Sequence, residues 1–527
     1  MSDVETSAGA EPGASGAAPG SNGPGSRTAE TSTAPARQTW YLSRRLFLAG
    51  IALCYGVAFA SLLVQVRGLF GAGGIQPLAA GLAAAAAGTP WWRAPSLLWF
   101  GASDAVLLAL CWCGLALAAL VVLGILPRLA LALAWVAYLS FVSVGEPFLN
   151  FQWDALLLEA GFLAIFLAPG GVRPFGRDER EPSRVLLWLV RWLLFRLMLL
   201  SGVVKLASGD ECWWKLGALD YHYWTQPLPH RLSHYVHWLP EWFQHVSVVL
   251  MFAVELGAPL LVFAPRRCKQ IAAVAITSLM ALIFATGNYG FFNLLTAVLC
   301  IPLVDDRAWR RLLRRPADPR AALEPELVER WRRAALGTLA TVVFLLTSTI
   351  SLLGVGLPAP SPLVSLYSLV APFECFNTYG LFRVMTKERP EIVIEGSADG
   401  ETWKPYRFRY KPLELERAPV FAGLHMPRLD WQLWFAALEH ERDFRARRQA
   451  WYPQFLGRLL EGSEPVLALL AENPFPDAPP RFVRSTVFLY EFGSPAARSD
   501  GIWWRRSDPQ TFFPTLTLVD GELRAVR

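Results

Sequence analysis

Long apolar runs limit how this chain can fold more than any other feature of its sequence. A helix that crosses a bilayer needs about 20 consecutive apolar residues, with a range of about 17–25. Stretches near that length recur, the fourth and the eighth of them short, at 46–66, 97–124, 129–145, 155–168, 185–204, 246–264, 271–286, 290–304 and 336–357. The sequence therefore predicts a polytopic α-helical membrane bundle of about nine spans within residues 40–357.

The two flanks of this bundle differ in composition. Residues 1–39 are mostly Gly, Ala, Ser, Pro and Thr without a hydrophobic period, which predicts a disordered tail. This tail lacks the apolar core of a signal peptide, so we expect the first span to direct insertion. Charged residues make up only 17% of the chain, against about 25% in soluble domains, and the membrane part accounts for the deficit. Residues 358–527 are predicted to form a soluble domain.

Basic residues indicate the side of the membrane on which each predicted loop lies. Cytoplasmic loops carry the excess of Lys and Arg. With a cytoplasmic N-terminus, the inner loops contain Arg37, Arg44, Arg45, Arg128, Arg173, Arg177, Arg180, Arg184, Arg266, Arg267, Lys269 and the run from Arg307 to Arg333. Fewer basic residues occur in the predicted outer loops, which are 67–96, 146–154, 205–245 and 287–289. Nine spans then place the soluble domain on the non-cytoplasmic side.

The same loops account for the net charge of +6. Basic residues at the cytoplasmic face set the orientation and contact anionic lipid. Binding of nucleic acid instead requires basic residues interleaved with exposed aromatic residues on a soluble face. We therefore expect the lipid bilayer as a partner and no nucleic acid.

The predicted outer loop 205–245 combines aromatic and ionisable residues. Tyr and Trp prefer the membrane–water interface, so the aromatic residues alone predict a loop on the bilayer surface. Ionisable residues at membrane depth are costly and suggest a function; here they are Lys205, Asp210, Glu211, Asp220 and His222. A structural loop and a functional surface remain alternatives. The surface would present Trp213, Trp214, Asp220, Tyr221, Tyr223 and Trp224.

Two acidic residues, Glu159 and Glu255, lie inside predicted spans. Membrane carboxylates usually face the interior of a bundle and pair with a basic group, for which Arg191 and Arg196 are the predicted partners. Such pairs either fix the packing of helices or line a polar cavity.

The seven cysteines form no CxxC motif, which argues against a zinc or thioredoxin-like site. On the predicted topology only Cys212 and Cys375 face the oxidising side. They either form a disulfide between the outer loop 205–245 (the aromatic loop) and the soluble domain or remain unpaired thiols.

His230, His234 and His237 share one face if their segment is helical. Three histidines on one face can bind a metal ion, but interfacial packing with the polar tips in water explains the pattern as well. We expect no metal site.

The soluble part alternates strand and helix patterns. Two strands within 391–411 flank a turn at 397–400, which predicts a hairpin, and further strand patterns occur at 481–492 and 513–519. Between them, 428–472 has a helical period. The sequence predicts an α+β domain with a mostly antiparallel sheet. Because no Gly-x-Ser-x-Gly, phosphate-loop or His-Glu-x-x-His motif occurs, a binding or docking role is favoured.

Several long motifs occur in order along the chain. They are 55–71 followed by Gly74-Ile-Gln-Pro, Asn150-Phe-Gln-Trp-Asp-Ala-Leu-Leu-Leu-Glu, Trp213-Trp-Lys, Asp220-Tyr-His-Tyr-Trp-Thr-Gln-Pro-Leu-Pro, Gly287-Asn-Tyr-Gly-Phe-Phe-Asn, Asn377-Thr-Tyr-Gly-Leu-Phe, Pro427-Arg-Leu-Asp-Trp-Gln-Leu-Trp-Phe and Asn473-Pro-Phe-Pro. Through these motifs, about residues 40–520 resemble the lipase maturation factor family.

This resemblance implies a multi-span membrane protein. Animal members of the family reside in the endoplasmic reticulum and assist folding and assembly of secreted dimeric lipases, and no catalytic residue set defines the family. The Ala, Gly, Pro and Arg-rich composition and the lack of an Asn-x-Ser/Thr sequon predict a bacterial homologue. We expect a multi-pass protein of the bacterial cytoplasmic membrane, or of the endoplasmic reticulum membrane in a eukaryote. Its N-terminus would be cytoplasmic and its C-terminal domain periplasmic or lumenal.

A second resemblance points to an enzyme. Gly202-Val-Val-Lys-Leu, followed by an aromatic-rich segment and Gly217, resembles a motif of vitamin K-dependent gamma-carboxylases and their bacterial membrane relatives. A lysine serves in catalysis there, and the resemblance assigns that role to Lys205. A lysine at a desolvated membrane edge can have a depressed pKa and act as a base. The neighbourhood of Trp153-Asp154 has no His where those enzymes have a second catalytic residue.

Two hypotheses of function follow. The first is a membrane-embedded maturation factor, without a cofactor, whose soluble domain and aromatic loop contact a secreted or lipase-like client protein. The second is a gamma-carboxylase-like membrane enzyme that uses Lys205, with Asp154 or His222 assisting. Passive transport through the bundle has only Glu159 and Glu255 in its favour.

Overall fold

The computed structural model describes residues 37–85, 88–176, 179–316, 318–319, 329–439, 451–507 and 509–526. Residues 1–36 of the predicted disordered tail lie outside this range.

Every predicted apolar stretch forms a helix. In chain order these helices are α1 (Tyr41–Leu63), α4 (Asp104–Val122), α5 (Pro127–Val142), α6 (Gln152–Leu167), α7 (Arg184–Ala207), α11 (Glu241–Phe252) with α12 (Ala258–Leu261), α13 (Arg266–Thr286), α14 (Phe292–Cys300) and α16 (Arg330–Gly354). In the described part of the chain, six of them are long and apolar enough to cross a membrane, namely α1, α4, α7, α11 with α12, α13 and α16. The chain is thus a multi-pass membrane protein, and the count of nine spans stays a prediction.

The second stretch begins later than its hydropathy predicts. Residues 97–100 form a short 3-10 helix, and α4 begins at Asp104 because the Ser103 side chain accepts a hydrogen bond from the Val106 backbone at the helix N-terminus. Short helices also occupy the connections: α2 (Val66–Phe70), α3 (Leu78–Ala85), α8 (Glu211–Trp214), α9 (Ala218–Thr225), α10 (Arg231–His237), α15 (Asp306–Leu312) and α17 (Ser361–Val370).

The predicted inner loops come together at one end of the bundle. Glu179 forms ion pairs with Arg44 and Arg45 at the start of α1. Asp306 accepts hydrogen bonds from the Tyr41 and Ser43 backbone at 2.7 and 3.0 Å. Segments far apart in the sequence therefore share one end, as the charge pattern predicts.

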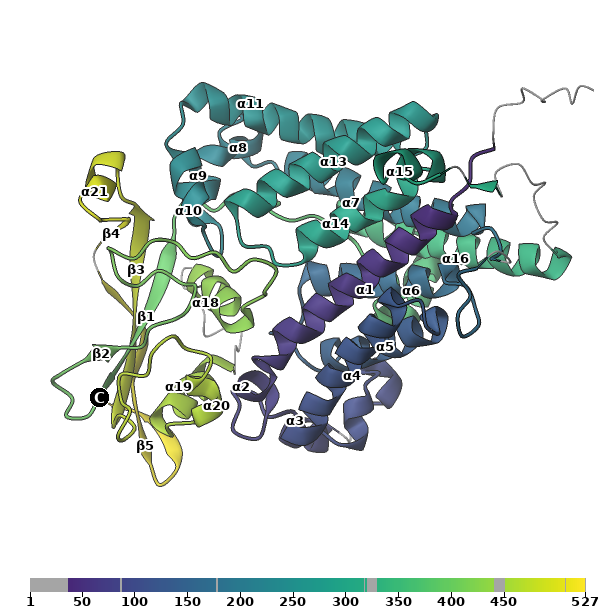
Figure 1. Ribbon diagram of the computed structural model, residues 1–527. Helices are drawn as coiled ribbons and strands as arrows, with labels where there is room; N and C mark the ends of the chain where they lie inside the picture. The colour runs from purple at the N-terminus through teal and green to yellow at the C-terminus, as the bar shows by residue number, and fades with distance from the viewer. Residues whose placement is uncertain are drawn as a thin grey trace, which may run out of the picture. The chain divides into compact units, whose positions relative to one another are not determined.

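The C-terminal part is an α+β domain with an antiparallel sheet, as predicted. The sheet order is β2-β1-β3-β5-β6, with β4 also paired to β3. Its strands are β1 (Pro390–Ser397), β2 (Lys404–Pro405), β3 (Phe482–Phe492), β4 (Trp504–Arg506), β5 (Gln510–Val519) and β6 (Glu522–Ala525), and its helices are α18 (Arg428–Leu438), α19 (Trp451–Leu460), α20 (Glu464–Leu467) and α21 (Pro495–Ser499). Helices α18 and α19 cover one face of the sheet (Figure 1).

Side-chain chemistry fixes the predicted hairpin. The Asp399 carboxylate accepts hydrogen bonds from the Glu401 and Thr402 backbone at 2.9 and 2.8 Å, and Gly400 has a φ of +86°. Glycine adopts this left-handed conformation without steric cost. The second strand of the hairpin is only two residues long, since the chain leaves the sheet after Pro405.

Candidate functional site

Lys205 lies in the last turn of α7 and is buried. Its Nζ lies 2.8 Å from both carboxylate oxygens of Glu255 and 3.0 Å from the Ser201 carbonyl oxygen. The ring of Trp213 covers the ammonium group at 5.4 Å. Glu255 belongs to a π-helical turn, Ala253–Gly257, between α11 and α12. Because a π turn inserts one extra residue into a helix, it turns Glu255 toward α7.

These contacts make Lys205 a poor candidate for a base. An ammonium group has three donors and no acceptor, and Glu255 with Ser201 occupies them. A lysine held as the cation of a buried ion pair has no free lone pair to accept a proton. The gamma-carboxylase-like alternative therefore has no support in this geometry.

His222, on α9, lies near Lys205. Its Nε2 is 3.2 Å from the Tyr289 hydroxyl, which also donates to Gln226 Oε1 at 3.0 Å. Burial, together with the positive charge of Lys205, lowers the pKa of His222 to about 4. The imidazole is neutral at neutral pH and forms a polar chain with Tyr289 and Gln226.

Asp154, the other predicted helper of Lys205, belongs to a different cluster. Its carboxylate lies 2.5 and 2.8 Å from the guanidinium of Arg428 and 2.5 Å from the Tyr138 hydroxyl, and all three groups are buried. Arg428 comes from α18 of the C-terminal domain. The structure thus brings His222 near Lys205 but assigns Asp154 to the attachment of the C-terminal domain.

The predicted partners of the two membrane carboxylates are half confirmed. Glu159 pairs with Arg196 and accepts a hydrogen bond from the Tyr379 hydroxyl at 2.6 Å. Glu255 pairs with Lys205 instead of an arginine, because α7 extends to Ala207 and carries Lys205 into the bundle. Arg191 donates to the Pro302 carbonyl oxygen at 2.8 Å. Each carboxylate thus forms an ion pair with a basic residue of another helix.

Only part of the aromatic loop is accessible. Trp213 and Tyr223 are buried, while Asp220, Tyr221 and Trp224 are half-buried. Trp214 is 63% exposed. Trp213 packs on Phe252, and Tyr223 lies in a cluster with aromatic residues of β3 and β4. These two residues are packing residues and not members of an exposed surface, because Trp213 lies against α11 and the C-terminal domain covers Tyr223.

The C-terminal domain contacts all four predicted outer loops. In loop 67–96, the Gly74 carbonyl oxygen accepts a hydrogen bond from Arg458 at 2.8 Å, and the Gly73 carbonyl oxygen accepts one from Ser463 at 2.6 Å. Arg428 donates to the Phe148 carbonyl oxygen at 3.2 Å in loop 146–154. Arg389 donates to the Trp224 carbonyl oxygen at 3.0 Å in loop 205–245. The Ala422 backbone donates to Asn288 Oδ1 at 2.7 Å in loop 287–289. The domain therefore rests on one end of the bundle.

Sequence reasoning did not find the docking residues Arg389 and Arg428. Arg428 lies within the family-like segment that begins at Pro427, but no local pattern pairs it with Asp154, 274 residues earlier in the chain. A buried guanidinium requires a three-dimensional partner, and a single sequence gives no signal for it.

Of the two alternatives for Cys212 and Cys375, the structure has the unpaired one, and both are buried free thiols. They lie in different packing clusters, Cys212 with Trp213 and Val248, and Cys375 in the main core of the bundle. The Cys375 thiol donates to the Phe373 carbonyl oxygen at 3.4 Å. Local packing thus accounts for each thiol separately.

The histidine stripe has a packing role. His230 caps the N-terminus of α10, and His234 Nε2 lies 3.0 Å from the Gly493 carbonyl oxygen. The ring of His237 lies against Phe492. Each ring has its own environment, so the stripe does not converge on a metal ion.

A different group of possible ligands was not anticipated. Asp220, Glu241 and His245 have ligand atoms within 4.8 Å of one another. Glu241 is 79% exposed in its side chain, and such solvated groups are common without a metal ion. The i, i+4 spacing of Glu241 and His245 is visible in the sequence, but Asp220 comes from α9.

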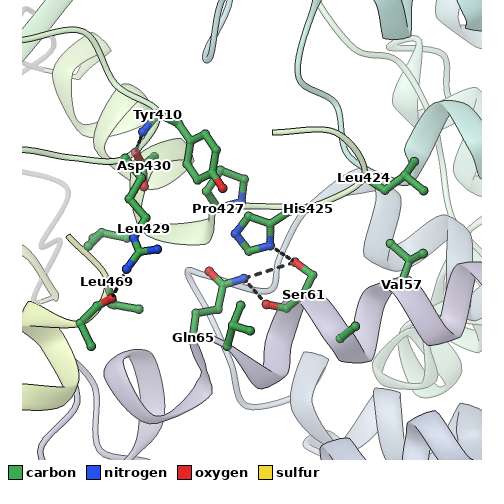
Figure 2. Close-up of a pocket in the computed structure, with 14 residues that line it drawn as sticks. Val57, Ser61, Gln65, Tyr410, Leu424, His425, Pro427, Leu429, Asp430 and Leu469 are labelled. Atoms are coloured by element: carbon green, nitrogen blue, oxygen red, sulfur yellow. Dashed lines mark hydrogen bonds between the residues drawn. The ribbon is translucent and has the colours of Figure 1, made fainter. Parts of the chain in front are cut away.

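A cavity of about 550 Å³ opens between the end of α1 and the C-terminal domain. Figure 2 shows Ser61, Gln65 and His425 at its floor, with Tyr410 and Asp430 opposite. Ser61 Oγ lies 2.9 Å from His425 Nδ1 and accepts a hydrogen bond from the Met426 backbone at 3.0 Å. These bonds hold segment 424–428 against the membrane helix.

The chain matches known proteins along nearly its whole length. Residues 42–311 match the family described as the lipase maturation factor transmembrane domain, and residues 375–514 match the lipase maturation factor C-terminal domain. No solved structure matches.

Three relatives show the extent of the similarity. Lipase maturation factor 2 of Gallus gallus is 35% identical over 91% of this chain and 82% of its own length. The Homo sapiens protein of the same name is 35% identical over 92% of this chain and 84% of its own. Lipase maturation factor 1 of Mus musculus is 32% identical over 92% of this chain and 88% of its own.

Proposed function

The chain belongs to the lipase maturation factor family, and from that membership we propose that it is a membrane-embedded maturation factor for a secreted, lipase-like client protein. The observation that carries the proposal is the similarity over 82% or more of the length of relatives that bear this name. It includes both the membrane part and the C-terminal domain. The proposal therefore concerns the whole assembly and not one module.

The geometry of the polar residues supports a factor without its own chemistry. In the described ranges, Lys205, Asp154 and His222 do not converge on one cavity, and Lys205 is neutralised by Glu255. The buried ion pairs join helices to each other and to the C-terminal domain. They hold a binding surface in place, which is what a folding factor requires.

The orientation belongs to the same proposal. The C-terminal domain rests on the four loops that are poor in basic residues, and the opposite end contains the arginine-rich loops. The positive-inside rule then places the N-terminus in the cytoplasm and the C-terminal domain in the periplasm, or in the lumen of the endoplasmic reticulum if the source is eukaryotic. The composition favours the bacterial cytoplasmic membrane.

We place the client contact on the accessible side of the aromatic loop. Trp214 is 63% exposed, and Trp238 and Trp242 nearby in the chain are 43% and 66% exposed. Exposed tryptophans are enriched among residues that dominate protein–protein binding. A client lipase that is still folding offers complementary apolar surface.

Co-expression with a secreted lipase of the same organism tests the proposal. We expect the chain to raise the yield of active secreted lipase and to capture the lipase from detergent extracts. Trp214→Ala should weaken this capture roughly five- to thirtyfold, which corresponds to about 1–2 kcal/mol at an interface hot spot. The matched control is Trp331→Ala, because Trp331 is 67% exposed at the start of α16, toward the opposite end.

A charge-deletion variant separates the two hypotheses of function. Lys205→Met with Glu255→Met removes the ion pair without leaving either charge buried alone. A maturation factor should retain lipase maturation in this variant. Complete loss of function with an unchanged thermal midpoint would favour the enzymatic alternative.

A further inference from the structure

The cavity at the end of α1 has a membrane helix as its apolar wall. Val57, Ala60, Ser61 and Val64 line it from α1 and the residue after its end. Their spacing of i, i+3, i+4 and i+7 places them on one face of the helix. On the other side, Leu424 of the segment before α18 adds to the apolar lining. A hollow, not a packed side chain, thus faces this part of the membrane helix.

The position of the cavity along α1 places it at the edge of the bilayer. α1 has 23 residues, which gives a length of about 34 Å, close to the bilayer hydrocarbon thickness of about 30 Å. Val57 to Leu63 form its last two turns, and Val64 follows its end. The cavity therefore lies where acyl chains meet headgroups.

Hydrogen-bond donors gather at the polar end of the cavity. Ser61 Oγ accepts from the Met426 backbone at 3.0 Å, and it lies 2.9 Å from His425 Nδ1 and 3.4 Å from the Met426 carbonyl oxygen. His425 Nε2 has no hydrogen-bond partner among the described residues, and in the tautomer with its hydrogen on Nε2 the ring can donate to a ligand. The Tyr410 hydroxyl points toward the same space in Figure 2, with the two rings 5.8 Å apart.

Two arginines near this end favour an acceptor as the bound group, while the Asp430 carboxylate also lines the cavity. Burial and the nearby Arg428 and Arg409 lower the pKa of His425 to about 4, so its ring is neutral at neutral pH. Arg409 uses Nε and Nη2 on the carbonyl oxygens of Leu470 and Ala468 at 3.1 and 3.0 Å. Its side chain lines the cavity and adds a positive charge there.

The Asp430 carboxylate does not take up these donors. It accepts hydrogen bonds from the Tyr410 and Lys411 backbone at 3.0 and 3.2 Å. The His425 ring and the Tyr410 hydroxyl are thus left to meet a ligand.

We propose that this cavity binds an acyl chain with a carboxyl or carboxyl-ester head, drawn from the adjacent membrane leaflet. The chain lies against Val57, Ala60 and Val64, and the head accepts hydrogen bonds from His425 and Tyr410. A volume of about 550 Å³ falls in the range of about 300–1,000 Å³ that is typical of small-molecule sites. The site stands apart from the proposed client surface and does not depend on the proposed function.

Photolabelling of the full chain in mild detergent tests the site. The probe is palmitic acid with a diazirine in its chain, and labelled peptides are identified by mass spectrometry. We expect saturable labelling of the peptides that contain Val57 to Val64 or Leu424 to Asp430. If the site binds a free acid, excess oleate should compete with the probe. If it binds the ester of a membrane lipid, excess phosphatidylcholine should compete and oleate should not.

Two substitutions that fill the cavity provide the comparison. Ala60→Trp, or Val64→Trp if the first variant folds poorly, should reduce the labelling of these peptides at least tenfold. The control is Leu53→Trp, because Leu53 is on α1, 51% exposed and outside the cavity lining; it should leave the labelling unchanged. Equal labelling in a folded cavity-filling variant, or labelling that neither oleate nor phosphatidylcholine displaces, would overturn the proposal.

Discussion

Helices α7 and α16 have almost the same length and pack against each other, yet their surroundings differ. Of the most apolar 18 residues in each, 61% are buried inside the protein in α7 and 22% in α16. α7 carries Arg191, Arg196 and Lys205 in its span, whereas the basic residues of α16 lie in its first turn. Charges inside the membrane occur where protein, and not lipid, surrounds the helix, since only protein supplies a partner for each charge.

The segment that follows α16 and α17 contributes to the buried ion pair of Glu159 and Arg196. The chain leaves α16, forms α17 and reaches Asn377, whose backbone donates to Glu159 Oε2 at 3.0 Å. Arg196 in turn donates to the Asn377 carbonyl oxygen at 2.8 Å. The segment after α17 thus completes the ion pair between α6 and α7.

Removal of a single charge from α7 should cause the largest loss of stability. Arg196→Leu leaves Glu159 buried without its cation, and we expect a loss of about 3–5 kcal/mol in the free energy of unfolding. Thermal unfolding in detergent measures the change. Leu345→Ala on α16 is the control, because Leu345 is 41% exposed and should lose less than about 1 kcal/mol.

The double variant Arg196→Leu with Glu159→Leu sharpens the result. It removes both charges, and it should recover part of the lost stability even though the Tyr379 hydroxyl loses its acceptor. No recovery would mean that the guanidinium stabilises through packing and not through its charge.

Glu374, at the end of the segment from α17, should give an intermediate, pH-dependent effect. Burial and the nearby Asp154, Glu159 and Glu146 raise the pKa of its carboxyl group to about 7, from an ordinary value of 4.5. A carboxyl whose folded pKa is raised stabilises the fold fully below pH 4.5 and loses that contribution as pH rises through 7. The wild type should therefore lose on the order of 1–3 kcal/mol from this group on going to pH 8.

Glu374→Gln should abolish that part of the pH dependence. We expect the variant to be more stable than the wild type at pH 8 and similar to it near pH 4.5, as measured by thermal midpoints across this range. Glu416 is exposed, and Glu416→Gln should follow the wild-type curve. A wild-type and Glu374→Gln difference that does not change with pH would contradict the assignment.

The contrast between the two helices was only partly predictable from the sequence. Hydropathy predicted both spans, because lipid and protein interiors select the same apolar residues. The pairing of Glu159 with Arg196 was predicted, since both residues lie inside spans and need a partner. The pairing of Lys205 with Glu255 was not, because the end of α7 was placed before Lys205 and the π turn that directs Glu255 has no sequence signature.

The soluble domain shows the same limit. The strands at 481–492 and 513–519 and the turn at 397–400 are local patterns, and each forms where the sequence predicts it. Burial of Tyr223 depends on where the C-terminal domain rests. That position follows from the contacts of Arg389 and Arg428 with loops that are far away in the sequence. Local sequence patterns therefore could not predict which side chains of the aromatic loop are exposed.

A pair of glycines should give the smallest effects and the most direct test of the surroundings. A Cβ at Gly202 of α7 would lie 2.5 Å from Leu256 Cδ2, whereas a Cβ at Gly337 of α16 would meet nothing within 4 Å. Gly202→Ala should destabilise by about 1 kcal/mol because it presses on the π turn that carries Glu255. Gly337→Ala should instead stabilise by about 0.5–1 kcal/mol, the usual gain from replacing an unhindered helical glycine. Opposite signs in thermal unfolding would confirm that α7 is enclosed and α16 is peripheral, and a loss of equal size at both positions would show that an unseen partner covers α16.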